Sequence, residues 1–188
     1  KNVAADLNLA AVSALSHVMV STVVPEVLGL HQRYDGNPTI AAALGQAQMS
    51  AGATDAALAT FADALRLSPR NVPLTVRYAE ALMRAGRARE AHVMLLDLFN
   101  NVPPTPEQIR LTALAASAAG DTGDAYFYMS EYHIANGNLP LSMQQLELAL
   151  AAPNLTGVQR QRFQARLDEV REAISKDRKR KPEEPARG

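Results

Sequence analysis

Residues 38–69 read PTIAAALGQAQMSAGATDAALATFADALRLSP, in which two helix-forming segments are separated by a glycine and closed by a proline. The positions that define the pattern are Leu44, Gly45, Gly52, Ala57, Phe61, Ala64 and Pro69. Small residues let two helices approach closely, a large apolar residue fills the gap between them, and Gly and Pro stop each helix. The stretch therefore predicts a tight antiparallel helix hairpin.

The same pattern recurs along the chain with a period of 34 residues. The recurring positions are Gly52, Gly86 and Gly120, then Ala57, Ala91 and Ala125, and Pro69 with Pro103. This period is the length of a tetratricopeptide repeat (TPR), a helix pair that stacks on the next pair. Such a stack buries its core between neighbouring repeats and leaves an extended face for binding. The sequence predicts an all-α, TPR-type α-solenoid of antiparallel helix hairpins.

The period changes after Gly120, because the next glycine of this kind, Gly137, follows after only half a repeat. The helix between these glycines then serves as the second helix of one repeat and the first of the next. Counted from there, Ser142, Leu146 and Ala149 take the small, large and small positions of a closing repeat. We expect about four repeats, the first degenerate and the last two sharing a helix, followed by a C-terminal capping helix.

The helices and domain limits follow from this register. Helices are predicted over residues 4–18, 21–34, 39–51, 54–67, 73–85, 88–100, 107–119, 124–135, 141–151 and 156–176. These form one TPR solenoid domain over 1–176: a degenerate leading hairpin (1–36), repeats at 38–69, 72–103 and 106–153, and a capping helix (156–176). Residues 177–188, which mix basic and acidic side chains, are expected to be a disordered tail.

Composition narrows the classes of function. The 19 basic and 19 acidic residues cancel, whereas a nucleic-acid-binding protein needs a basic surface. The absence of cysteine excludes disulfides and thiolate metal sites. No apolar stretch reaches the length of a membrane span. The chain begins at Lys1 with neither an initiator Met nor a signal peptide, so we expect an excised fragment or a processed chain.

The sequence contains no recognised motif of a catalytic, zinc-binding or phosphate-binding site. The four histidines, His17, His31, His92 and His133, show no HExxH or other zinc-binding spacing. There is also no GxSxG, GxGxxG or phosphate-binding loop and no cysteine nucleophile. We therefore predict that this chain is not an enzyme and has no catalytic residue, cofactor or metal.

A ligand is expected on the first helix of each repeat, because those helices line the concave face of such a stack. The residues predicted to form the groove are Gln46, Met49, Val76, Arg77, Glu80, Met83, Arg84, Arg110, Leu114, Ser117, Phe127 and Glu131. Their mixture of flexible apolar and charged side chains favours an extended or partly unfolded polypeptide. The carboxylate clamp of Hsp90-type co-chaperones is excluded, since its five positions here read Ala42, Gln46, Arg77, Glu107 and Leu111.

Two further clusters have alternative interpretations. Residues 126–132, YFYMSEY, concentrate aromatic rings on one helix; core packing is the favoured explanation, and a ring in the groove is the alternative.

The basic run at 178–181 is interpreted as a solubilising tail, because Glu183 and Glu184 follow it. A nuclear signal or a patch for anionic lipid is the alternative.

The C-terminal half resembles a known family. The ordered motifs are DAYFYMSEYHIANGN at 124–138, SMQQLELALAAP at 142–153 and QRQRFQARLDEV at 159–170. They look like the C-terminal TPR domain of periplasmic HExxH zinc metalloproteases of the β-barrel assembly-enhancing protease family. The resemblance covers roughly residues 38 to 176.

This resemblance implies a periplasmic location and docking of outer-membrane β-barrel proteins or their assembly machinery, in the service of quality control. Zinc and catalysis would belong to a separate protease domain, since no residue here matches the HExxH helix. The full-length parent would then be a zinc metallopeptidase. The alternative is a stand-alone TPR scaffold, or a chaperone-like adaptor, for envelope assembly or secretion. Under either interpretation the partner is a protein or peptide, with no nucleic acid and no membrane insertion.

Overall fold

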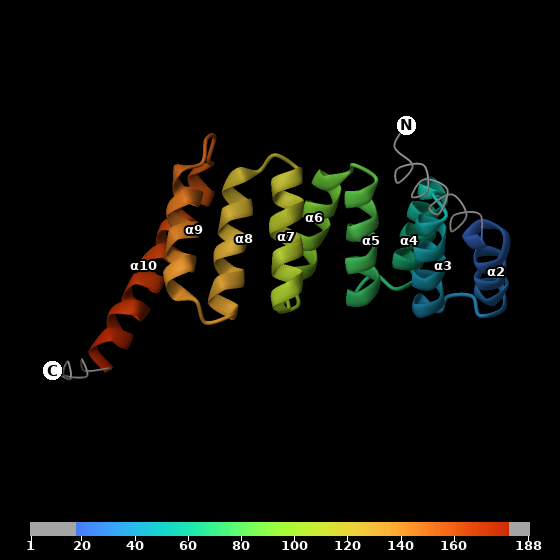
Figure 1. The fold of residues 1–188 in the computed structure, drawn as a ribbon, viewed down its shortest axis with the longest axis horizontal. Helices are drawn as coiled ribbons and strands as arrows, with labels where there is room; N and C mark the ends of the chain where they lie inside the picture. The colour runs from blue at the N-terminus through green and yellow to red at the C-terminus, as the bar shows by residue number, and fades with distance from the viewer. Residues whose placement is uncertain (1–17, 181–188) are drawn as a thin grey trace, which may run out of the picture. The chain divides into compact units, whose positions relative to one another are not determined.

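The computed structural model describes residues 18–180, and within this range the regular structure is helical (Figure 1). The elements are η1 (Met19–Val23), α2 (Val24–Arg33), α3 (Pro38–Ser50), α4 (Thr54–Leu67), α5 (Val72–Arg84), α6 (Ala88–Phe99), α7 (Pro106–Ala118), α8 (Thr122–Ala135), α9 (Leu139–Ala151) and α10 (Gly157–Arg180). The helices predicted between residues 39 and 176 are confirmed, and apart from the end of α10 their bounds differ only by the usual uncertainty of helix ends.

The chain divides into two compact units between Asn101 and Val102, and each is described by itself. The division falls at the start of the sequence VPPTP (102–106), where prolines interrupt helix formation. The N-terminal unit contains η1 and α2 to α6, and the C-terminal unit contains α7 to α10. The sequence-based expectation of one solenoid domain over 1–176 stays a prediction.

The N-terminal unit is built around the hairpin of α3 and α4. Gly45 on α3 lies against the ring of Phe61 on α4, which is 1% exposed and stacks on Tyr78 of α5 with ring centroids 5.9 Å apart. Ala57, Leu44 and Leu74 are buried beside it. The small and large positions read from the sequence are therefore the contacts that hold these helices together.

The beginning of the described chain forms only part of a hairpin. A short π-helical turn, η1, leads into α2, whose Pro25 lies in its first turn, where proline is tolerated. None of the residues of α2 is buried, and Leu28, Leu30 and Tyr34 are exposed. The helix predicted over 4–18 lies almost entirely outside the described residues.

In the C-terminal unit, α8 packs against both α7 and α9, and the turns at its two ends are alike. At the first turn, the N–H groups of Gly120 and Asp121 donate to the carbonyls of Ser117 and Ala116. At the second, those of Gly137 and Asn138 donate to Ile134 and His133. The glycines have φ of 85° and 74°, conformations that side chains disfavour. The turns after α3 and α5 repeat this pattern at Gly52 and Gly86, so the shared helix is confirmed.

The capping helix α10 completes this unit. Its Phe163, Leu167 and Val170 are buried in one cluster with Phe127 of α8 and Leu146 and Ala149 of α9. Ser142, Leu146 and Ala149, predicted at the closing positions, are all fully buried. The predicted capping helix therefore packs on the end of this unit through an apolar face.

The end of α10 corrects one expectation. The helix continues past Lys176 to Arg180, so the predicted disordered tail does not begin at residue 177. The physical reason is local: Lys176 Nζ lies 2.6 Å from Glu172 Oε1 one turn earlier, and the first proline after the helix is Pro182. The predicted tail from 181 to 188 lies outside the described residues.

Candidate protein-binding faces

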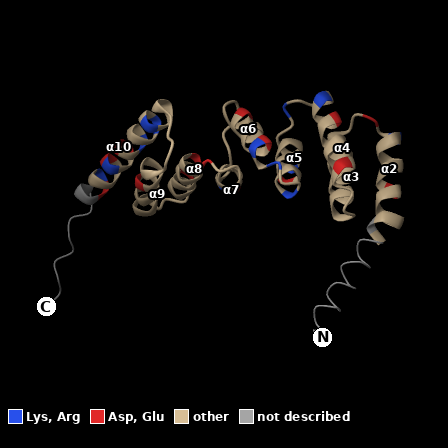
Figure 2. Ribbon diagram, turned by 90° about the horizontal axis from the view of Figure 1, so that it is seen from above, with Lys and Arg blue, Asp and Glu red and all other residues tan. Residues whose placement is uncertain are grey.

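The first candidate face lies on α3 and α5 in the N-terminal unit. These two helices pack against each other and form one layer, and α4 and α6 lie on the other side (Figures 1 and 2). All the groove residues predicted before residue 101 project from this layer. Gln46, Met49, Val76, Glu80 and Met83 are half-buried, and Arg77 and Arg84 are exposed.

Helical periodicity explains why these side chains remain accessible. On α5, Leu74, Ala81 and Leu82 are buried against the neighbouring helices. Val76, Glu80 and Met83 recur at the i, i+4, i+7 spacing of one side of a helix and are only half-buried. The result is a row of partly covered apolar side chains beside charged ones.

The charged side chains on this face form only a weak ion pair among the described residues. Arg77 Nη1 lies 3.2 Å from Glu80 Oε2, and the two side chains are 56% and 37% exposed. A pair in contact with solvent contributes little to stability. Arg84 makes no ion pair with any carboxylate in residues 18–180. Among these residues, the face therefore presents one cation without an ion pair and one weak pair.

The second candidate face is the exposed side of α7 in the C-terminal unit. The side chain of Thr105 and that of Gln108 cap the helix reciprocally, and Pro106 follows the cap. Arg110, Leu114 and Ser117 then fall on one side and are exposed, Leu114 by 46%. Arg110 forms no ion pair with a described carboxylate. This part of the prediction is accessible as expected.

Phe127 does not belong to a groove, which corrects the sequence-based assignment. Phe127 is 8% exposed, and its ring stacks on the ring of Phe163 of α10, with the two ring centroids 4.9 Å apart. The guanidinium of Arg162 covers the ring at 4.4 Å from the centroid. Because α8 is covered on several sides, its phenylalanine ring falls in the core, in agreement with the favoured interpretation of the aromatic cluster.

Glu131 is also engaged within the C-terminal unit. Its two carboxylate oxygens accept hydrogen bonds from Arg166 Nε and Nη2 of α10, at 2.6 and 2.8 Å. These bonds, and a further one to Glu169, raise the pKa of Arg166 despite its partial burial. Glu131 therefore fastens the capping helix, and a ligand would have to displace that contact.

A polar network between α8 and α10 was missed by sequence reasoning. Asp124, only 5% exposed, accepts a hydrogen bond from Arg162, and Gln159 Nε2 donates to Asp124 Oδ1 at 3.3 Å and to Asp121 Oδ2 at 3.2 Å. The partners lie far apart in sequence on separate helices, so no local spacing connects them. The excess of acidic residues at the start of α8 and of arginines on α10 was the available signal.

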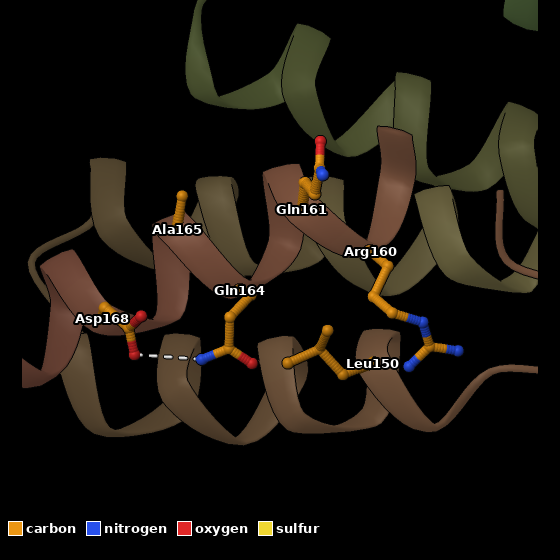
Figure 3. Close-up of a pocket in the computed structure, with 6 residues that line it drawn as sticks. All are labelled: Leu150, Arg160, Gln161, Gln164, Ala165 and Asp168. Atoms are coloured by element: carbon orange, nitrogen blue, oxygen red, sulfur yellow. Dashed lines mark hydrogen bonds between the residues drawn. The ribbon is translucent and has the colours of Figure 1, made fainter. Parts of the chain in front are cut away.

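A pocket between α9 and α10 was also not predicted (Figure 3). It has a volume of about 560 Å³ and is lined by Leu150 of α9 and by Arg160, Gln161, Gln164, Ala165 and Asp168 of α10. Its lining combines a cation, a carboxylate, two amides and two apolar side chains. None of these residues was assigned a role from the sequence.

None of the helices within residues 18–180 is both long and apolar enough to cross a lipid bilayer.

Comparison with known proteins supports the fold. A tetratricopeptide repeat family model matches residues 48–115. Two solved structures, "MamA RS-1 ArsTM double mutant" and "MamA 41-end from Desulfovibrio magneticus RS-1", superpose with TM-scores of 0.58 and 0.56 at 12% and 13% identity. The matches cover 87% and 88% of this chain and 94% of each MamA chain. Among curated protein sequences there is no match. The chain is an all-α, TPR-type solenoid.

Proposed function

We propose that this chain is a non-catalytic scaffold that binds an extended or partly unfolded polypeptide on the face formed by α3 and α5. The observation that carries the proposal is the composition of this face. Met49, Val76 and Met83 are only half-buried, and they alternate with Arg77, Glu80 and Arg84. Flexible methionines adapt to differently shaped apolar side chains, and neighbouring charges orient a polar backbone.

The face on α7 extends the same function to the C-terminal unit. Leu114 offers an exposed apolar contact, and Arg110 is a cation without an ion pair among residues 18–180. Each face is proposed by itself as a binding surface. The folds of the repeat family and of MamA support a binding role in general, and the residues above support its location.

The proposal is tested with a fluorescently labelled, permanently unfolded model protein, followed by anisotropy. Wild-type chain should bind, and the double substitution Val76→Glu with Met83→Glu should weaken binding by roughly tenfold or more, since two apolar contacts of about 1 kcal/mol each are lost. The matched control is Val93→Glu on α6, which adds the same type of charge at a position that is 61% exposed. Circular dichroism verifies that each variant is folded. Equal weakening by the control variant, or no binding by wild type, would contradict the proposal.

A second candidate function follows from the ordered motifs at 124–138, 142–153 and 159–170. It is the substrate-docking or machinery-docking half of a periplasmic metalloprotease that acts in outer-membrane protein assembly and quality control. Periplasmic location and outer-membrane β-barrel partners belong to this candidate. Two measurements separate it from a stand-alone scaffold: sequencing upstream of Lys1 for an HExxH helix, and comparing an unfolded outer-membrane β-barrel protein with an unrelated unfolded protein as ligands. Equal affinity for both ligands and no upstream protease domain would exclude it.

A further inference from the structure

The pocket between α9 and α10 has an ordered polar row along one side. In Figure 3, Arg160, Gln164 and Asp168 project from α10 toward α9, and Leu150 of α9 lies between Arg160 and Gln164. The three residues are spaced four apart, so successive members lie about 6 Å apart along the helix and the row spans about 12 Å. A cation therefore stands at one end of the pocket. At the other end stands the carboxylate of Asp168, whose Oδ1 lies 4.0 Å from Arg171 Nη1 in an exposed pair with which a ligand cation would compete.

Arg160 differs from three other arginines on the same helix, Arg162, Arg166 and Arg171. Arg162 pairs with Asp124, Arg166 with Glu131, and Arg171 with Glu147 at 3.0 Å, so each is neutralised by a carboxylate from α8 or α9. Arg160 is exposed and has no carboxylate partner within residues 18–180. The three paired arginines fasten the cap, whereas Arg160 is left at the mouth of the pocket.

Gln164, in the middle of the row, is oriented by a hydrogen bond to Asp168. Gln164 Nε2 donates to Asp168 Oδ1 at 3.0 Å, which leaves the amide oxygen of Gln164 as an acceptor (Figure 3). Beside it, Leu150 and Ala165 provide apolar surface, and Gln161 provides a second amide. The pocket therefore combines a hydrogen-bond acceptor, an apolar surface and two opposite charges. An extended peptide can complement these with a backbone N–H, an apolar side chain and two charged side chains.

We propose that this pocket binds an extended peptide segment of about five residues, with an acidic side chain at Arg160 and a basic side chain at Asp168. Side chains alternate between the two faces of an extended chain, which advances about 3.4 Å per residue, so the first and fifth side chains share a face and lie about 14 Å apart, close to the 12 Å length of the row. One peptide N–H donates to Gln164 Oε1, and the central side chain contacts Leu150. The occupant is a protein segment with separated opposite charges, and the site is independent of the face on α3 and α5.

The test uses the full chain and a labelled peptide, acetyl-Glu-Ala-Ala-Ala-Lys-amide, followed by anisotropy and by the side-chain amide signals of Gln164 in NMR. Wild type should bind and shift those signals. Arg160→Glu should weaken binding by roughly tenfold, because attraction is replaced by repulsion. A peptide with Lys in place of Glu should recover affinity for that variant. Binding should also weaken at high salt, since the contacts are exposed.

The matched control is Arg89→Glu on α6, an exposed arginine with no described ion pair, which changes the net charge by the same amount. This control should leave peptide affinity unchanged. Equal weakening by Arg89→Glu, failure of the exchanged peptide to recover binding, or unmoved Gln164 signals would each overturn the proposal. Substitutions at Val76 and Met83 should not affect this peptide, so failure here is distinguishable from failure of the α3 and α5 face.

Discussion

The ring of Phe61 occupies the space that a β-carbon on Gly45 would need: two of its ring carbons lie 2.6 Å from that position. The contact joins α3 to α4, and the ring is in turn stacked on Tyr78 of α5. Three helices therefore depend on the absence of one side chain. The contact explains why a glycine at 45 is matched with a large ring at 61 in this hairpin.

Gly45→Ala should destabilise the chain by about 1–3 kcal/mol, because a buried ring must move to make room for the methyl group. The free energy of unfolding in urea measures the effect. Gly29→Ala in α2 is the matched control, since nothing lies within 4 Å of its β-carbon position. That control should be neutral or stabilising by up to about 1 kcal/mol, as alanine favours helix. A neutral Gly45→Ala would show that the ring is not tightly held.

Gly137→Ala should destabilise the C-terminal unit by about 1–2 kcal/mol, because its φ of 74° is unfavourable for any residue with a side chain. Nothing lies within 4 Å of the β-carbon position, so the loss would come from the backbone alone. Gly157→Ala, which has neither a positive φ nor a close neighbour, is the control in the same urea titration. Equal effects at both positions would argue against a conformational cause.

The ion pair of Arg166 and Glu131 should contribute about 1 kcal/mol to the docking of α10, measured as the coupling energy in a double-mutant cycle with alanine. Both side chains are partly covered, with 33% and 22% exposed, so solvent screens the pair only in part. The cycle of Arg171 with Glu147, about half exposed, should give roughly 0.3 kcal/mol. Adding salt should reduce both couplings. A larger coupling for the exposed pair would contradict this ranking.

Alkaline conditions should destabilise the C-terminal unit through Tyr128. Burial raises the pKa of this phenol above its ordinary value in the folded state. The folded state then holds the proton more tightly, so this contribution to stability is present below about pH 10 and is lost as pH rises through the folded pKa. Urea titrations between pH 8 and 11 should show a smaller loss for Tyr128→Phe than for wild type. Parallel pH profiles for the two would refute the assignment.

Much of the fold was predictable because local rules and periodicity point to the same answer. Gly52, Gly86 and Gly120 mark helix-to-helix turns through a conformation that glycine favours, and Ala57, Phe61 and Ala64 mark a packed face. Even the change of period at Gly137 was informative, because the turn at Gly137 has the same hydrogen bonds as the turn at Gly120. The accessible groove residues on α3, α5 and α7 follow from the same helical register.

The helices, their turns and the small-to-large packing within each hairpin follow from the sequence alone, because these depend on residues close together in the chain. Which polar side chains meet depends on the tertiary structure. Phe127 is a core residue because Phe163 and Arg162, from a helix that follows in sequence, cover its ring. Arg162 and Arg166 hold the capping helix through ion pairs, whereas Arg160, beside a pocket, has no ion pair among residues 18–180. Contacts between distant helices depend on how the helices pack, which no local spacing encodes.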